Sequence, residues 1–400
     1  MTPPPASKRP KRILAWGTYD LGKPRVRILL RGLRENGVLI IECHRHVWSG
    51  VEDKSQVKGV RAGMRLALRW LLAYPRLLWC YLRAPGHDAV LFPYLGQLDI
   101  LILWPLAKLR RRPLILDAFL SLYNTVVEDR QLIGRRNPLA WALYGWEWLA
   151  CHAADWILVD THAHGAYFQH TYGIDAKRIH RVLVGVEPER FPPAPPQNRS
   201  QRTQGSGTVN PYRVLFYGQF IPLHGIDTVV RAAKLTEGEN IHWHLIGTGQ
   251  EAPRIERLVA DLQPNNLTWT RWVPYPELVQ QIHNAEVCLG IFGATDKAAR
   301  VIPNKVFQIL AAGRPVITRD GPAARELATL APAVRLIAPT DPTALAAAVR
   351  ALRRRPALVS TVDGASRDLI ESAIGPTAVV ASLATRLREL RCEQIPCAES

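Results

Sequence analysis

The chain has 400 residues, which is long for one ordinary domain and suits two domains of about 200 residues each. Hydrophobic residues make up 48% of it, so a compositionally disordered protein is excluded. The net charge of +17 is uneven: residues 1–200 hold 29 Lys/Arg against 16 Asp/Glu, and residues 201–400 hold 22 against 18. The first half is therefore expected to bind an anionic partner, either a nucleic acid or an anionic bilayer.

The sequence predicts neither a secretion signal nor a membrane span. Residues 1–12 are rich in proline and basic residues and lack an apolar core, and no run of 18 apolar residues occurs. The six cysteines are scattered without a CxxC pair, which argues against a zinc site or a disulfide framework and favours a reducing compartment. We expect a cytoplasmic protein that is soluble or peripheral on the inner face of the plasma membrane.

The first half begins as a parallel α/β sheet begins. A short apolar strand over residues 12–16 ends at Gly17, and a loop and a helical pattern follow it. Further strands are predicted at residues 38–41, 89–92, 114–116, 156–159 and 181–184, with helical patterns between them. The alternation predicts a doubly wound sheet.

Residues 57–84, between two of these strands, form a basic amphipathic helical pattern. Lys58, Arg61, Arg65 and Arg69 recur every three or four residues, while leucines and tryptophans supply apolar bulk. Together with the cluster at residues 110–112, this pattern favours a helix on a membrane surface, and an ordinary surface helix is the alternative. Nucleic-acid binding is less favoured, because the basic stripe is interleaved with leucines and no nucleic-acid-binding motif occurs.

Residues 197–212 are polar and carry glycine and serine, which is typical of a linker. The second half then opens like the first, with an apolar strand that starts at residue 213 and ends at Gly218. Later strands are predicted at residues 242–246, 267–269, 287–290, 316–317 and 334–337. We therefore predict two doubly wound, Rossmann-like domains, at residues 1–196 and 213–375, that face a central cleft.

The most informative stretch is residues 301–318, which predicts a helix from Pro303 to Gly313 and a short strand after it. Backbone N–H groups at a helix start attract phosphates, Lys305 adds a positive charge there, and Gln308 shares its face. This pattern indicates a nucleotide-type ligand. A buried helix packed on a sheet explains the stretch equally well when it is taken alone.

Other chemistries have little support. The pairs His44/His46 and His162/His164 lack a nearby cysteine or acidic third ligand, so no metal is expected. No nucleophile elbow and no G-x-G-x-x-G loop occurs, which disfavours a hydrolase and a dehydrogenase.

The ordered motifs resemble those of glycosyltransferase family 4, the group 1 glycosyl transferases of the GT-B fold. The motifs are Phe216-Tyr-Gly, Pro222-Leu-His-Gly-Ile-Asp, Leu245-Ile-Gly-Thr-Gly-Gln-Glu and the helix that starts at Pro303; in the first half, residues 16–25 resemble the family's glycine loop. The resemblance implies a retaining transferase that moves a sugar from a nucleotide-sugar to a lipid-linked or polysaccharide acceptor at the cytoplasmic membrane face. It also implies no cofactor, and a C-terminal segment, residues 376–400, that packs back on the first domain.

The resemblance implies site residues as well. Catalytic roles would fall on Lys305, Arg300 and His224. Donor-binding positions would be Gly218, Gln219, Gly247, Thr248, Trp272, Val273, Pro303, Asn304, Val306 and Gln308. Acceptor-side positions would be Gly17, Tyr19, Asp20, Gly22, Lys23 and Asp117. Closure of the two domains would exclude water from the reaction.

The chain departs from the family pattern at four of these positions. Arg300 and Gln308 stand where the family has two glutamates, and Gln219 and His224 stand where it has a basic pair. Glutamine lacks the charge-assisted bond of a carboxylate, and histidine is charged only when protonated. An active enzyme and a catalytically degenerate GT-B binding or scaffold protein both remain open.

Overall fold

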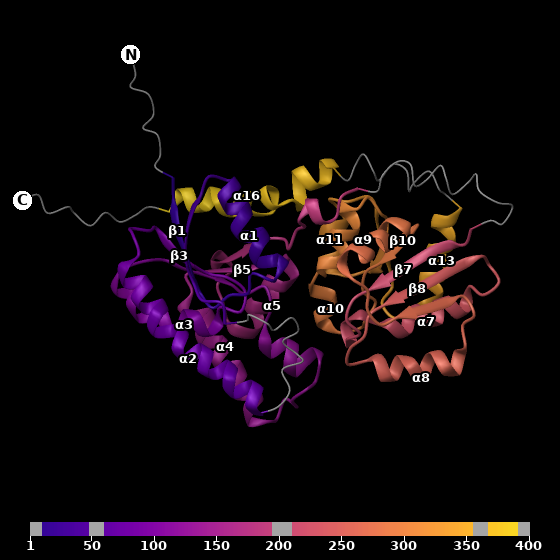
Figure 1. Cartoon of the computed structure of the whole chain (residues 1–400), viewed down its shortest axis with the longest axis horizontal. Coiled ribbons are helices and arrows are strands. Elements are labelled where there is room, and N and C mark those ends of the chain that lie inside the picture. Colours follow the sequence, from indigo (N-terminus) through magenta and orange to yellow (C-terminus); the bar gives the residue numbers. More distant parts are fainter. Residues whose placement is uncertain (1–9, 48–59, 194–209, 355–366, 391–400) are drawn as a thin grey trace, which may run out of the picture.

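The structure is a computed structural model that describes residues 10–47, 60–193, 210–354 and 367–390, except for the side chains of residues 60–63 and 65–67. It has two lobes, seen side by side in Figure 1, each built on a six-stranded sheet. All the strand pairs are parallel, in the orders β2-β1-β3-β4-β5-β6 and β12-β11-β10-β7-β8-β9. This confirms the prediction of two doubly wound α/β sheets.

The first lobe alternates strands and helices along the chain. Its strands are β1 (Arg12–Gly17), β2 (Leu39–His44), β3 (Ala89–Phe92), β4 (Leu114–Asp117), β5 (Trp156–Val159) and β6 (Ile179–Arg181). Its helices are α1 (Pro24–Glu35), α2 (Val60–Arg83), α3 (Gln97–Leu109), the π-helical turn η2 (Asn124–Asp129), α4 (Pro138–Ala153) and α5 (His162–Tyr172).

The second lobe repeats this alternation. Its strands are β7 (Tyr212–Tyr217), β8 (Ile241–Ile246), β9 (Leu267–Thr270), β10 (Val287–Leu289), β11 (Val316–Arg319) and β12 (Val334–Ile337). Its helices are η5 (Pro222–His224), α7 (Ile226–Leu235), α8 (Ala252–Leu262), α9 (Tyr275–Asn284), α10 (Asp296–Arg300), α11 (Asn304–Ala311), α12 (Pro322–Ala328) and α13 (Pro342–Arg353).

Each sheet is buried on both faces, which explains why its strands are nearly continuous apolar runs. In the first sheet, Leu14 and Phe92 belong to one hydrophobic cluster, and Ile13 and Leu91 belong to another on the opposite face. The second sheet divides in the same way, since Phe216 packs with residues of α7 and α13 while Leu215, the preceding residue, packs with residues of α11. The segments that follow β5 and β10 meet at the boundary between the lobes, where Thr161 Oγ1 donates to the carbonyl oxygen of Arg300.

The C-terminal helix α16 (Pro376–Glu389) lies along α1 of the first lobe, as the yellow ribbon at the top of Figure 1 shows. The contact is close, because a Cβ atom built on Gly32 would lie 2.0 Å from the backbone oxygen of Pro376. Asn36 Nδ2 also donates to Thr377 O at 2.9 Å. The chain therefore crosses to the second lobe and returns to the first.

Several predicted boundaries differ from the structure, among them the end of the last strand of the first lobe and the end of the linker. The last strand of the first lobe ends at Arg181, whereas the sequence predicts one over residues 181–184. Arg25 accounts for the difference, because its Nη1 donates to the carbonyl oxygens of Val182 and Leu183 at 2.6 and 2.9 Å. Residues 197–209 of the predicted linker lie outside the described residues, and its last residue, Tyr212, already belongs to β7.

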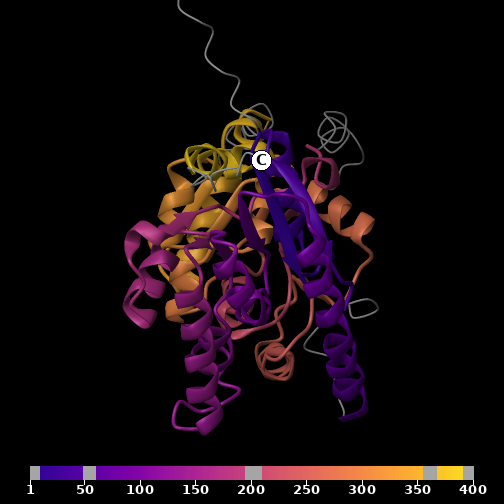
Figure 2. The same ribbon diagram turned by 90° about the vertical axis from the view of Figure 1, so that its left-hand side faces the viewer.

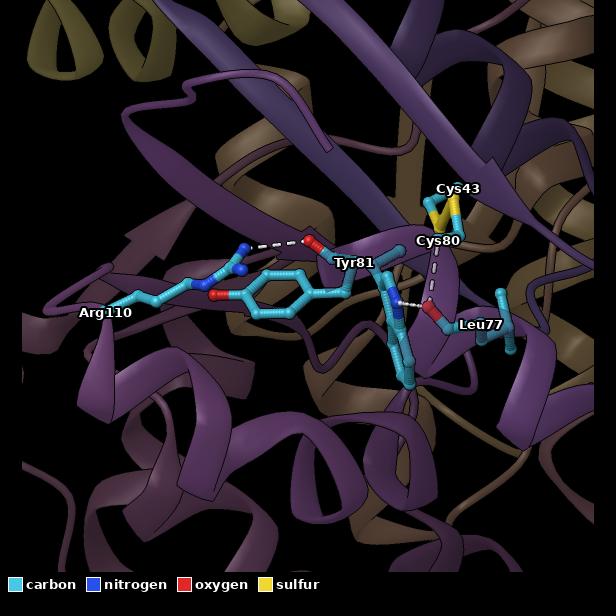
Figure 3. Close-up of a disulfide and its surroundings, with 6 residues drawn as sticks. Cys43, Leu77, Cys80, Tyr81 and Arg110 are labelled. Carbon is cyan, nitrogen blue, oxygen red and sulfur yellow. Dashed lines mark hydrogen bonds between the residues drawn. A yellow bond between two sulfur atoms is a disulfide. The ribbon is translucent and has the colours of Figure 1, made fainter. Parts of the chain in front are cut away.

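Two cysteines are bonded to each other, although the sequence argues against a disulfide framework. Cys43 of β2 and Cys80 of α2 form a disulfide, with their Cα atoms 6.2 Å apart (Figure 3). The two residues are 37 positions apart, and they meet because α2 packs across the first sheet. The carbonyl oxygen of Leu77 on the same helix accepts a hydrogen bond from Trp16 Nε1 at 3.0 Å.

The predicted basic amphipathic segment forms α2, although Lys58 and the side chains of Arg61 and Arg65 lie outside the described part of the chain. Arg69 is exposed. Arg110, from the predicted basic cluster, donates to the carbonyls of Tyr81 and Leu82 and so caps the end of α2 (Figure 3). Within the described ranges, no helix combines the length and apolar character needed to cross a bilayer.

Candidate functional site

Two glycine loops meet where β7 and β8 end. Gly218 and Gly247 both have positive φ, and a Cβ atom on Gly247 would lie 1.9 Å from Gly218 O. The loops are joined by backbone hydrogen bonds from Gly218 N to Ile246 O and from Phe220 N to Thr248 O, both of 2.9 Å. Only glycine allows backbones to approach this closely. The two loops therefore expose main-chain atoms at the carboxyl edge of the second sheet, where ligands of such sheets bind.

Lys305 lies directly below the first of these loops, in the first turn of α11. It is 6% exposed, its Nζ donates to Tyr217 O at 3.3 Å, and it lies 3.6 Å from the centre of the Phe216 ring. A Cβ atom on Gly218 would lie 3.8 Å from this Nζ. Burial lowers the pKa of Lys305 well below its usual value, because the apolar surroundings disfavour the ammonium form. An anion at the loop would supply the missing counter-charge.

His224 lies on the other side of Gly218. Its Cε1 would be 3.4 Å from a Cβ atom on Gly218, and its Nδ1 is hydrogen-bonded to Gln219 O. Burial, followed by the nearby charges of Lys305 and Arg130, lowers the pKa of His224 well below 6.5. The His224 ring is therefore neutral at neutral pH. Among the described residues, Lys305 is then the basic side chain beside Gly218 that can carry a positive charge.

The start of α11 follows the prediction closely. Pro303 is the N-cap residue, the helix spans Asn304–Ala311, and Gly313 has φ of 70°. The Val306 side chain is buried, and its N–H donates to Pro303 O at 2.9 Å. Gln308 Oε1 accepts a hydrogen bond of 3.0 Å from the Tyr217 hydroxyl. The amide of Gln308 is thus held at the face that it shares with Lys305.

The remaining donor-side positions lie at the surface of the second lobe. Gln219, Thr248 and Trp272 are exposed, and Val273 is half-buried. Behind them, the Trp269 ring stacks on Phe220, and its Nε1 donates to Gly247 O at 2.9 Å. Trp269 therefore supports the second glycine loop.

Arg300 lies at the boundary between the lobes. Its guanidinium group lies 4.3 Å from the centre of the Tyr167 ring, a cation–π contact with α5 of the first lobe. Its carbonyl oxygen accepts a hydrogen bond of 2.5 Å from Thr161 Oγ1. In this structure Arg300 joins the lobes.

The glycine loop of the first lobe is held from below by a residue that sequence reasoning missed. Asp99, in the first turn of α3, accepts hydrogen bonds from Thr18 N at 2.8 Å and from the Tyr74 hydroxyl at 2.9 Å. A Cβ atom on Gly17 would lie 2.1 Å from Asp99 Oδ2, so glycine is required there. Burial raises the pKa of Asp99 to about 6.

The predicted acceptor-side residues differ in how they are placed. The side chain of Tyr19 is buried, and its hydroxyl donates to Glu42 at 3.0 Å. Asp20 is half-buried, and its Oδ1 accepts from Gly22 N at 2.8 Å, which shapes the loop that ends at Lys23, the N-cap residue of α1.

Asp117 is fully buried and forms a salt bridge of 2.8 Å with Arg25, which is itself 1% exposed. Arg25 Nε also donates to Asp117 Oδ2 at 3.1 Å, so the pair is bidentate. The carboxylate of Asp117 is therefore engaged inside the first lobe rather than at the boundary.

Polar side chains that follow the strands also connect the lobes, and sequence reasoning missed them. Thr295 Oγ1 donates to Asp129 Oδ1 at 3.0 Å, and Lys297 Nζ donates to Thr125 Oγ1 at 2.6 Å. Burial lowers the pKa of Lys297 to about 8, and Asp129 partly offsets this effect. The carboxylate of Glu326 accepts from the N–H groups at the start of α5. The sequence offered one signal for these connecting residues, namely their position in the segments that follow predicted strands.

One histidine of each pair is bonded to another group of the protein. His44 Nε2 is bonded to Tyr19 O at 2.7 Å, and His164 Nδ1 is bonded to Asp160 Oδ1 at 2.6 Å. Within the part of the chain that the structure describes, no group of three or more His, Cys, Asp or Glu side chains could hold a metal ion.

Residues 211–355, which contain both glycine loops and α11, match the family model described as "Glycosyl transferases group 1". The second lobe is therefore similar to the group 1 glycosyl transferases. No curated protein matches the chain. The family therefore supports the interpretation of the second lobe, and enzymes of this family depend on nucleotide-sugars.

Solved structures show that the whole chain has the GT-B fold. HepE of Anabaena in complex with UDP is 13% identical with a TM-score of 0.64, and the match covers 95% of this chain and 100% of HepE. Sucrose-phosphate synthase of Thermosynechococcus elongatus is 18% identical with a TM-score of 0.68, covering 95% and 99%. WaaG, a glycosyltransferase involved in lipopolysaccharide biosynthesis, is 16% identical with a TM-score of 0.58, covering 94% and 99%.

Proposed function

We propose that this glycosyltransferase moves a sugar, with retention of configuration, from a nucleotide-sugar to a lipid-linked or saccharide acceptor on the inner face of the plasma membrane. In this proposal residues 213–375 hold the donor, residues 1–196 hold the acceptor, and residues 197–212 link the two domains. The lipopolysaccharide enzyme WaaG among the similar structures supports an acceptor of this class.

The observation that carries the donor assignment is the buried Lys305 beneath two touching glycine loops. Its ammonium group has no carboxylate partner among the described residues, and it lies at the start of a helix that attracts anions. A diphosphate at Gly218 and Gly247 would offset its desolvation, and Lys305 would then stabilise the leaving diphosphate. At the start of α11, the main-chain N–H groups of Asn304 and Lys305 would bind phosphate oxygens, while Pro303 and Val306 would fix the first turn that presents them.

The remaining donor residues would then have defined tasks. Gln308 would bind a ribose hydroxyl, while Gln219 and Thr248 would line the loops. Trp272 and Val273 would lie beside the base. His224 would act as a neutral hydrogen-bonding group near the diphosphate, because burial keeps it uncharged. Arg300 would act through closure of the lobes, which its contact with Tyr167 supports.

On the acceptor side, the loop from Gly17 to Lys23 would face the incoming hydroxyl through its backbone and Asp20. Asp99 supports this assignment, since it holds the loop in one conformation from below. The side chains of Tyr19 and Asp117 would serve to position the loop and the lobe.

The proposed donor site predicts a selective response to nucleotides. HepE has been solved with UDP and with UDP-glucose, so we expect UDP to be the nucleotide that this chain prefers. Thermal-shift measurements with UDP, GDP, ADP and their glucose or mannose conjugates should show stabilisation by one nucleotide and its conjugate. If none of them binds, the donor assignment fails and a degenerate GT-B scaffold is favoured.

The membrane part of the proposal rests on two helices of the first lobe, which lie on its lower side in Figure 1. Helix α2 extends downward in Figure 2 and contains no acidic residue, and the only acidic residue of α4 is the buried Glu147. Both helices expose large apolar side chains, namely Met64, Leu68, Leu71, Leu72, Trp79, Leu82, Leu139, Trp141, Trp148 and Leu149. Exposed arginines of α2 lie among its apolar side chains at positions 69, 76 and 83. Tryptophan with arginine and without acidic residues is the composition that suits an anionic bilayer surface.

We expect Trp79→Ser combined with Trp141→Ser to weaken binding to vesicles that contain anionic lipid at least about tenfold, because both rings would leave water for the interface. Leu235→Ser, which changes an exposed apolar residue of the second lobe, is the matched control. Vesicle sedimentation measures the effect, and structured RNA serves as the competing ligand. Equal binding by all variants, or tighter binding to RNA than to vesicles, would contradict the membrane assignment.

A further inference from the structure

Two neighbouring side chains at the boundary between the lobes each keep a buried polar atom without a hydrogen-bond partner among the described residues. These atoms are Asp129 Oδ2 and Arg130 Nε. Asp129 is 4% exposed, and its other oxygen accepts from Thr295 Oγ1. Buried polar groups in folded proteins are nearly always paired, because an unpaired one loses its hydration without compensation. Consecutive residues thus provide one acceptor atom and one donor atom that have no partner among the described residues.

Their position is beside the proposed donor site. Gln250 Nε2, next to the second glycine loop, donates to Arg130 O at 3.2 Å, and Thr295, which contacts Asp129, precedes α10. The first lobe therefore projects residues 129 and 130 towards the loops that would carry the donor.

The turn that carries these residues is held rigidly from below by the buried carboxylate of Glu147. Glu147 accepts hydrogen bonds from Leu122 N and Tyr123 N, both at 3.0 Å, and from the hydroxyls of Ser121 and Tyr172 at 2.8 and 2.7 Å. The same Ser121 oxygen accepts from Asn124 N at 3.0 Å, at the start of η2. This support is the kind that fixes a binding residue before its ligand arrives.

We propose that Asp129 and Arg130 form a subsite of the first lobe for a sugar hydroxyl. The hydroxyl donates its proton to Asp129 Oδ2 and accepts from Arg130 Nε–H, since a hydroxyl is a donor and an acceptor at once. A phosphate fits poorly because the carboxylate would repel it. A metal cation fits poorly because Arg130 and Lys297 surround the carboxylate with positive charge. This inference rests on the proposed function, and the hydroxyl belongs either to the transferred sugar or to the acceptor.

The test compares Asp129→Asn and Arg130→Gln with Thr295→Ala. Asparagine at position 129 can still accept from Thr295 through one oxygen, but it presents an NH₂ group in place of the free carboxylate oxygen. Thr295→Ala removes the contact between the lobes and leaves the free oxygen unchanged, so it controls for weakened closure. Thermal unfolding of each variant verifies that it is folded, and Arg130→Gln gives an independent reading if Asp129→Asn is unstable.

Titration calorimetry would use the nucleoside diphosphate that stabilises the wild type, and its sugar conjugate. If the hydroxyl is on the donor sugar, both subsite variants should lose about ten- to a hundredfold in affinity for the conjugate and keep their affinity for the diphosphate. If it is on the acceptor, both affinities should stay unchanged and the KM for the acceptor should rise by a similar factor.

The subsite is overturned if both variants behave like Thr295→Ala, or if neither the conjugate affinity nor the acceptor KM changes. If the wild type binds no nucleotide, the proposed function and this subsite both fail. If the wild type binds a nucleotide but the variants show no specific loss, only the subsite fails.

Discussion

Replacing Lys305 with methionine should lower turnover by about a hundred- to a thousandfold while leaving the protein folded. Methionine keeps the apolar stem that packs over Phe216 and removes only the ammonium group. Because that group is buried without a carboxylate partner among the described residues, its loss should not lower the midpoint of thermal unfolding. The measurement is the rate of nucleoside diphosphate release with a saccharide or lipid-linked acceptor.

Lys234→Ala is the matched control for this prediction. Lys234 is a lysine of the same lobe that pairs with Glu237 at the surface, with 41% of its side chain exposed. It should keep wild-type turnover. Turnover of the Lys305→Met variant within about twofold of the wild type would remove Lys305 from the mechanism, because removing a preorganised charge costs far more than that.

The same residue predicts how donor binding depends on pH. Burial depresses the pKa of Lys305 without ligand, and a bound diphosphate would raise it again. Between the two pKa values the complex holds one proton more than the free protein, so affinity should fall as pH rises from the depressed pKa to the restored one. A nucleotide-sugar is the suitable ligand, since its diphosphate does not titrate in that range. Calorimetry in two buffers should detect proton uptake, and the Lys305→Met variant should show none.

Replacing Asp117 with alanine should destabilise the first lobe by about 3–5 kcal/mol. The substitution would leave the guanidinium group of Arg25, which is 1% exposed, buried without its carboxylate. Lys108→Ala breaks an ion pair whose side chains are 44% and 39% exposed, and it should cost about 0–1 kcal/mol. Chemical unfolding followed by tryptophan fluorescence measures both changes.

This experiment also separates two roles for Asp117. The resemblance to the family suggests an acceptor-side residue, whereas the pairing with Arg25 indicates a structural one. The structural role would be contradicted if the Asp117→Ala variant had the same midpoint of chemical unfolding as the wild type and a higher KM for the acceptor.

The sequence was a good guide where structure depends on local pattern. The strands at residues 89–92, 156–159 and 334–337 have the predicted bounds, because short apolar runs between turn residues are typical of strands in a parallel sheet. The start of α11 at Pro303 and the positive φ of Gly313 were also predictable, since proline and glycine restrict or extend the backbone by themselves. The same patterns placed Lys305 at the start of a helix.

The sequence alone therefore determined the fold class, the glycine loops and the helix that carries Lys305. Only the tertiary structure decided the charge of His224, the pairing of Asp117 with Arg25 and the Cys43–Cys80 disulfide. It also brought Asp129 to Thr295, 166 positions away. The physical reason is that pKa values and ion pairs depend on which atoms exclude water from a group, and these atoms come from distant segments. Local periodicity reports which face of an element is buried but not what it is buried against.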